Sequence, residues 1–131
     1  MRISGTFVDE ISHDIPHQNW GAKEWDADFS NMHALGIDTV IMIRAGYRKF
    51  LTYPSPFLIK QQACFSPKMD LVKLFIELAE KYGMTFYFGT YDSGKYWDTG
   101  DMNYEVALNI KVIKEAYDRY GKSTAFGGWY L

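Results

Sequence analysis

Cysteine is almost missing from this sequence: its 131 residues include one, Cys64. A single thiol cannot form an internal disulfide, so the chain is not a disulfide-stabilised scaffold and carries no sign of an oxidising compartment. A catalytic thiol would also need a base positioned beside it. We therefore assign Cys64 no chemical role.

An excess of positive charge is missing as well. The chain has 14 Lys and Arg against 16 Asp and Glu, which gives a formal net charge of -2. Proteins that bind nucleic acid or anionic membranes need basic surface to neutralise phosphate. We expect neither partner here.

Long apolar runs do not occur. No stretch approaches the ~20 residues that a bilayer crossing needs. Asp9 and Glu10 come too early for the apolar core of a signal peptide to form after Met1. The sequence therefore predicts no membrane span, and a protein that is either cytoplasmic or has lost an export signal.

Glycine-rich phosphate loops are the last absence. Neither the dinucleotide fingerprint nor the P-loop pattern is present, so we expect no nucleotide and no other cofactor. Aromatic residues, in contrast, are abundant at 18% of the chain, as 10 Tyr, 9 Phe and 4 Trp. That content is high for a small protein, and we expect some of these rings to line a ligand surface.

One pattern occurs three times along the chain: an amphipathic helix, a glycine at its end and then an apolar strand. The glycines are Gly36, Gly83 and Gly121. Before the second helix, Ser66 and Pro67 suit an N-cap and a first-turn proline. The predicted strands are 3–8, 38–43, 84–90 and 124–131, and the predicted helices are 22–35, 67–82 and 101–120.

Such a repeat predicts parallel strands joined by right-handed crossovers, with a ligand site at the carboxyl ends of the strands. The length fits one domain spanning 1–131. We expect an α/β fold that is half of a (β/α)₈ barrel, with four parallel strands and three crossover helices. An open doubly wound sheet obeys the same rules and remains the alternative.

The segment 46–65 is long for a connection between a strand and a helix. It is rich in apolar residues and contains Pro54-Ser55-Pro56. We expect a folded hairpin that covers one side of the cleft.

Several short motifs together resemble a known family. The ordered set comprises Gly5-Thr6-Phe7, the run Trp25 to Val40, Tyr53-Pro54-Ser55, Gly89-Thr90-Tyr91-Asp92, Tyr96-Trp97 and Gly128-Trp129-Tyr130. It is similar to a bacterial domain-of-unknown-function family among the cellulase-like (β/α)₈ glycoside hydrolases. The resemblance covers the whole chain but only the amino-terminal half of that fold.

This resemblance implies a sugar-cleaving or sugar-binding cleft at the carboxyl ends of the strands. It also implies a catalytic glutamate just beyond strand four and a second carboxylate after a later strand. The chain stops at Leu131, before either position. We therefore assign no catalytic residue, and expect the catalytic pair to lie elsewhere.

Charged residues at the predicted strand ends are the first candidates for binding sugar hydroxyls. Asp9 and Glu10 follow strand one, Arg44 follows strand two, and Asp92 follows strand three. A guanidinium at a strand end suits sugar oxygens, but it equally suits a salt bridge at the rim of a barrel. The carboxylates equally suit turn capping and solubility.

Aromatic residues at or beyond strand ends are the second candidates. Tyr47, Tyr91, Trp97 and Trp129 occupy such positions, where flat rings with a polar edge suit sugar faces. Rings there can instead plug the barrel mouth. His13 and His17 are four apart, but Pro16 between them opposes a regular helix, and we expect no metal site.

Four parallel strands cannot close a barrel, so two strand edges and one apolar face need a partner. We expect either a homodimer or a missing carboxy-terminal half-barrel to supply it. Two functions remain open: a glycoside-hydrolase-like domain that binds carbohydrate, and a non-catalytic half-barrel that binds glycan or self-associates.

Overall fold

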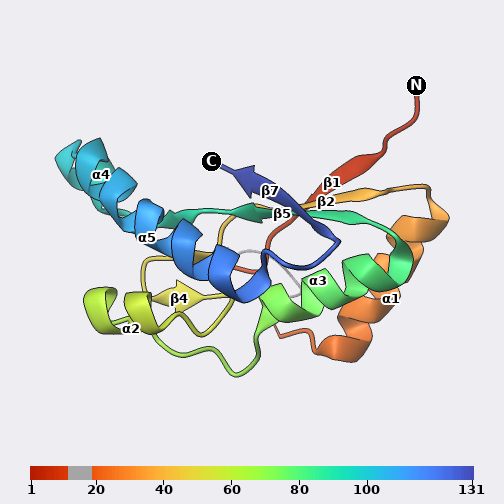
Figure 1. The fold of residues 1–131 in the computed structure, drawn as a ribbon, viewed down its shortest axis with the longest axis horizontal. Coiled ribbons are helices and arrows are strands. Elements are labelled where there is room, and N and C mark those ends of the chain that lie inside the picture. The colour runs from red at the N-terminus through yellow and green to blue at the C-terminus, as the bar shows by residue number, and fades with distance from the viewer. Residues whose placement is uncertain (12–18) are drawn as a thin grey trace.

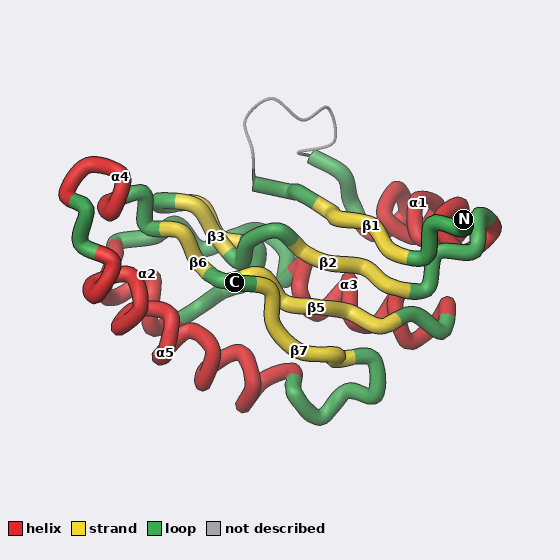
Figure 2. Tube along the Cα trace, turned by 90° about the horizontal axis from the view of Figure 1, so that it is seen from above, coloured by secondary structure: helices red, strands yellow, loops and turns green. Residues whose placement is uncertain are grey.

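The computed structural model describes residues 1–11 and 19–131 (Figure 1). Its main layer is a four-stranded sheet in the order β1-β2-β5-β7. These strands are Gly5–Val8, Thr39–Met42, Thr85–Gly89 and Phe126–Tyr130. All three pairings are parallel, which confirms the predicted sheet (Figure 2).

The long helices follow the strands in a regular alternation. They are α1 Ala22–Ala34, α3 Leu71–Tyr82 and α5 Met102–Tyr120, and Figure 1 shows them on the same side of the sheet. A doubly wound sheet would reverse its strand order and carry helices on both faces. The strands here keep their chain order, so the fold is half of a (β/α)₈ barrel.

The core lies between the sheet and these helices. Alternate strand residues Val40, Met42, Phe86 and Phe88 are almost completely buried, as the period of two along a strand requires. An aromatic cluster fills the space beneath them: the Phe75 ring meets Trp25 edge-on at 4.7 Å and stacks on Phe29 at 5.8 Å. Much of the aromatic content therefore builds the core rather than a ligand surface.

The opposite face of the sheet is concave and exposes apolar side chains. Phe7 on β1 is 51% exposed and Tyr130 on β7 is 40% exposed. These strands are the two edges of the sheet, yet the two ring centroids are only 5.3 Å apart. The sheet is therefore curved as strongly as a barrel wall.

Two glycines in β7 make room for a ring on this concave face. A Cβ added to Gly127 would lie 3.1 Å from the Tyr87 ring, and 2.3 Å from the Thr85 methyl group. Gly128 has a φ of 140°, which L side chains rarely adopt, and the β5–β7 register shifts nearby. The Gly128-Trp129-Tyr130 motif thus has a structural reason.

A second, smaller sheet extends the first beyond its strand ends. It has the order β4-β3-β6, from Phe50–Leu51, Gly46–Tyr47 and Tyr91–Asp92. The segment 46–65 therefore holds only a very short hairpin, β3–β4. The remainder forms the helix α2, Pro56–Gln62, which the sequence analysis missed although Ser55 and Pro56 are an N-cap and a first-turn proline.

Helix α3 begins four residues later than the sequence indicated. Its N-cap is Asp70, whose carboxylate accepts a hydrogen bond from the Lys73 backbone N–H at 2.9 Å, so the prediction of Ser66 and Pro67 at this helix start was wrong. The Tyr120 hydroxyl also donates to Asp70 at 2.6 Å. A short helix, α4 Lys95–Thr99, was not expected either.

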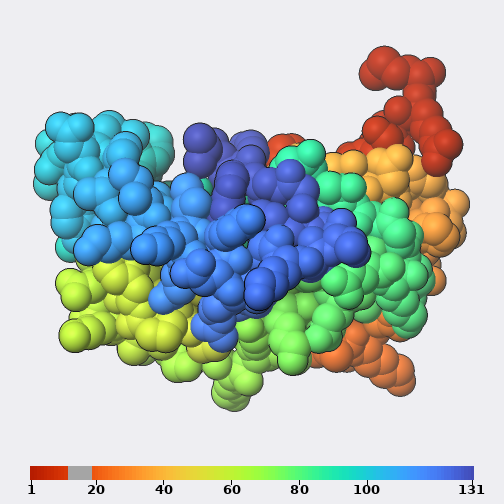
Figure 3. All heavy atoms as spheres, viewed as in Figure 1, coloured from red at the N-terminus to blue at the C-terminus, as the bar shows by residue number. Residues whose placement is uncertain are grey.

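The carboxylate of Glu115 fastens the segment 46–65 to α5. It accepts hydrogen bonds from the Tyr53 hydroxyl at 3.0 Å, the Phe57 backbone N–H at 3.2 Å and the Ser55 hydroxyl. Figure 3 shows this yellow-green segment directly against the blue helix. The Tyr53-Pro54-Ser55 motif is therefore a structural clamp.

Replacing Glu115 by Ala should lower the free energy of unfolding by about 2 kcal/mol, because the buried Tyr53 and Ser55 hydroxyls lose a charged acceptor. Urea denaturation measures this change. Asp118→Ala, which removes an exposed carboxylate from the same helix, is the matched control. Equal stability of both variants would disprove the clamp.

Candidate functional site

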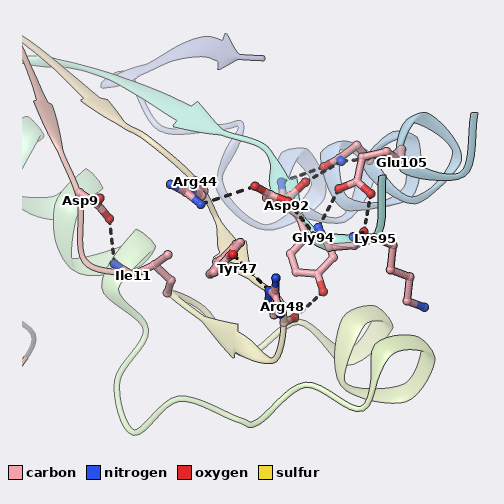
Figure 4. Close-up of polar contacts among 12 residues, drawn as sticks. Asp9, Ile11, Arg44, Tyr47, Arg48, Asp92, Gly94, Lys95 and Glu105 are labelled. Atoms are coloured by element: carbon pink, nitrogen blue, oxygen red, sulfur yellow. Dashed lines mark hydrogen bonds and ion pairs between the residues drawn. The ribbon is translucent and has the colours of Figure 1, made fainter. Parts of the chain in front are cut away.

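The carboxyl ends of the parallel strands bring three loops to one edge of the sheet. Asp9 and Glu10 follow β1, Arg44 follows β2, and Asp92 ends β6, which comes immediately after β5. Figure 4 shows Asp9, Arg44 and Asp92 along this edge. The sequence analysis therefore selected residues that the fold places along one side of the molecule.

Arg44, Asp92 and Tyr47 form a group at the centre of this edge. The Arg44 Nη1 lies 3.5 Å from the Asp92 Oδ2, and the guanidinium carbon lies 4.9 Å from the centroid of the Tyr47 ring (Figure 4). The Arg44 side chain is 29% exposed and that of Asp92 is 19% exposed. This partial exposure leaves hydrogen-bonding capacity for a ligand.

The backbone holds Asp92 in place. Its Oδ1 accepts a hydrogen bond from the Gly94 N–H at 2.8 Å, and its carbonyl accepts one from the Arg48 N–H at 2.8 Å. Gly94 has a φ of 74°, and an added Cβ would lie 2.9 Å from the Arg48 side chain. Glycine is therefore required at this turn.

A buried glutamate supports the turn from below. Glu105 on α5 is 7% exposed and accepts hydrogen bonds from the Ser93 backbone N–H and hydroxyl. Asn109, one turn further, holds both the N–H and the carbonyl of Tyr91 at 2.8 Å. The sequence analysis missed both residues, because polar positions on a helix carry no sign of the loop that they will meet.

Tyr91 does not point to a ligand. Its side chain is 3% exposed, and its hydroxyl donates to the Arg48 carbonyl. The buried Cys64 thiol donates to the same carbonyl at 3.3 Å, and burial raises the pKa of this thiol. We therefore remove Tyr91 from the candidate site, since the loop rather than a ligand uses its polar group.

The two tryptophans have different surroundings. Trp97, on α4, is 71% exposed, and its ring centroid lies 4.6 Å from that of Tyr96. Trp129, on β7, is half-buried and packs edge-on against Phe88 at 5.5 Å and Phe126 at 5.1 Å. Trp97 is thus the ring with the larger surface available to a sugar.

The carboxylates after β1 also differ from each other. Asp9 Oδ1 accepts a hydrogen bond from the Ile11 backbone N–H at 3.0 Å (Figure 4), which is a turn-forming contact. Burial of the Glu10 carboxyl, with a smaller contribution from the negative charge of Asp9, raises the pKa of Glu10 from 4.5 to about 8. Glu10 is therefore largely protonated at neutral pH.

Residues 1–11 and 19–131 contain no group of three or more His, Cys, Asp or Glu side chains that could hold a metal ion. His13 and His17, considered above as metal ligands, lie outside the described residues. Within the described part of the chain, no helix has the length and apolar character needed to cross a membrane.

Comparison with known proteins gives the family. Residues 3–131 match the family described as a domain of unknown function, DUF4434. The chain belongs to this family.

One solved structure matches this DUF4434 chain closely. It is the crystal structure of a putative alpha-L-fucosidase from Bacteroides thetaiotaomicron, with 63% identity and a TM-score of 0.93 over 99% of this chain. A curated protein from Marinobacter nauticus, sulfate adenylyltransferase subunit 2 1, is 25% identical over 114 residues, or 81% of this chain. The chain spans 40% of the solved structure and 38% of the curated protein.

Replacing Glu10 by Gln should flatten the dependence of stability on pH. The folded state binds the Glu10 proton more tightly than the unfolded state, so this residue's contribution to the free energy of unfolding falls as the pH rises from about 5 to 8. The stability of Glu10→Gln relative to the unmodified protein should therefore increase across this window.

Urea denaturation at pH 5, 6, 7 and 8 measures the difference. Glu77→Gln is the control, because the side chain of Glu77 is 57% exposed and pairs only with the nearby Lys73 among the printed ion pairs of α3. A difference between Glu10→Gln and the unmodified protein that stays constant over the four pH values would contradict a raised pKa.

Proposed function

We propose that this chain is the amino-terminal, carbohydrate-binding part of a glycoside-hydrolase-like protein. The observation that carries the proposal is the 63% identity, over 99% of this chain, to a structure reported as a putative alpha-L-fucosidase. At this identity the backbone and most side chains of the shared part correspond. An α-L-fucoside is accordingly the first glycoside to test.

The edge around Arg44 and Asp92 supports this proposal. A guanidinium and a carboxylate held together offer donors and acceptors in fixed directions, as recognition of adjacent sugar hydroxyls requires. Tyr47 and the exposed Trp97 add aromatic surface on the same side of the molecule. We assign Arg44, Tyr47, Asp92 and Trp97 to binding; Asp9 and Trp129 border them.

We assign the catalytic pair to the part of the protein beyond this chain. Glycoside hydrolysis uses two carboxyl groups on opposite sides of the scissile bond. Asp92 is engaged by Arg44 and Gly94, while Glu105 is buried beneath the turn that it supports. Both carboxylates serve to position the loops, and neither is free to attack or to protonate a glycoside.

The concave face requires a covering layer of protein. Phe7 and Tyr130 are exposed there, at the two edge strands of the sheet. The solved relative extends well beyond the 40% that this chain matches. This extent favours a carboxy-terminal half-barrel over a homodimer as the covering layer, because strands that follow in sequence are the usual neighbours in a barrel.

Replacing Trp97 by Ala should weaken sugar binding about fivefold, which corresponds to the loss of ~1 kcal/mol of stacking. Asp92→Ala should weaken it more, because Arg44 loses its partner. Calorimetric titration with L-fucose and turnover of 4-nitrophenyl α-L-fucoside measure binding and hydrolysis separately. Tyr117→Ala, which removes an exposed ring from the distant end of α5, is the control.

The two readouts distinguish the functions considered above. Binding with turnover supports a hydrolase. Binding without turnover of any aryl glycoside favours the non-catalytic glycan-binding alternative. Full affinity in both Trp97→Ala and Asp92→Ala would remove the Arg44–Asp92 edge from the site.

A further inference from the structure

We propose that the cavity at the end of β1 is a second binding subsite for an uncharged sugar ring, with Glu10 as its polar anchor and Phe50 and Trp20 as its apolar walls. This inference rests on the proposed function and adds a site to it. The argument depends on the shape of the cavity, the unpaired oxygen of Glu10 and the composition of the walls.

The cavity has a volume of about 600 Å³, within the range of sites for small molecules. Glu10 and Ile11 line it from the end of β1, Phe50 from β4, and Leu71 from the start of α3. These elements are far apart in the sequence and meet only in the folded chain. The described residues that line it include neither Arg44 nor Asp92, so the cavity is distinct from the group described above.

One oxygen of Glu10 has no hydrogen-bond partner. Its Oε2 is buried from solvent, and nothing in the described part of the chain donates to it or accepts from it. An unsatisfied buried polar atom costs free energy, and native proteins rarely leave one without a reason. A ligand hydroxyl in the cavity would supply the missing partner.

The protonation of Glu10 suits a neutral ligand. With a pKa of about 8, the carboxyl carries its proton at pH 7 and both donates and accepts hydrogen bonds. The charged groups on the surrounding elements are Asp9 beside it, Lys68 in the cavity wall, and Glu24, which accepts from the Gly21 N–H at 3.0 Å. A negatively charged ligand would meet the two carboxylates Asp9 and Glu24.

The walls suit the non-polar face of a sugar ring. The Phe50 side chain is 52% exposed at the cavity, and its ring is held edge-on by Phe65 at 5.7 Å. Trp20 is held edge-on by the buried Trp25 at 5.0 Å. Rings fixed in this way lose little conformational entropy when a ligand stacks on them.

Titration with L-fucose, D-galactose and D-xylose, followed by saturation-transfer NMR and calorimetry, tests the subsite. We expect saturation of the sugar to come from aromatic protons. Glu10→Ala and Phe50→Leu should each weaken binding at least fivefold. Glu10→Gln should retain binding at pH 7, because the amide still donates and accepts.

The pH dependence separates a direct role of Glu10 from a structural one. Binding by the unmodified protein should weaken at least threefold between pH 7 and 9, as Glu10 ionises and loses its donor, while Glu10→Gln should bind equally at both values. Glu77→Gln should behave as the unmodified protein at both values. Circular dichroism of each variant verifies that it is folded.

Two results would overturn the inference in different ways. If Glu10→Ala and Phe50→Leu bind as the unmodified protein does, while Trp97→Ala and Asp92→Ala lose affinity, the subsite is wrong and the proposed function stands. If the unmodified protein binds none of the three sugars, the proposed function fails and the subsite fails with it.

Discussion

The parallel pairing of β1, β2, β5 and β7 is the constraint on which the rest of this structure depends. Parallel strands need a crossover after each strand, and the crossovers place the long helices on one face of the sheet. They also bring every loop that follows a strand to the same edge. Asp9, Arg44 and Asp92 are side by side along that edge for this reason alone.

Buried carboxylates hold the loops at this edge. Glu115 receives three hydrogen bonds from the segment 46–65, and Glu105 receives two from Ser93. Both are the acceptors of donors that would otherwise be unsatisfied, so each stabilises a fixed backbone conformation. Glu10 differs from both, because one of its buried oxygens has no partner in the described part of the chain. That contrast separates a structural carboxyl group from one available to a ligand.

The relation to a solved DUF4434-like structure gives these details a functional context. The chain corresponds to 40% of that protein and carries the binding edge, a curved sheet and an exposed apolar face. A complete barrel would cover Phe7 and Tyr130 and would enclose the edge from the other side. Recognition of the sugar and cleavage of its bond are thus assigned to different halves of one fold.

The sequence by itself determined the order and type of the main elements, because apolar periodicity and helix-terminal glycines depend only on neighbouring residues. It also determined that polar residues follow the strands. Only the tertiary structure decided that Asp70 rather than Ser66 caps α3, since Tyr120 donates to Asp70 from a distant helix. It likewise buried Tyr91 and enclosed Glu10, because burial is set by contacts between segments that are remote in the chain.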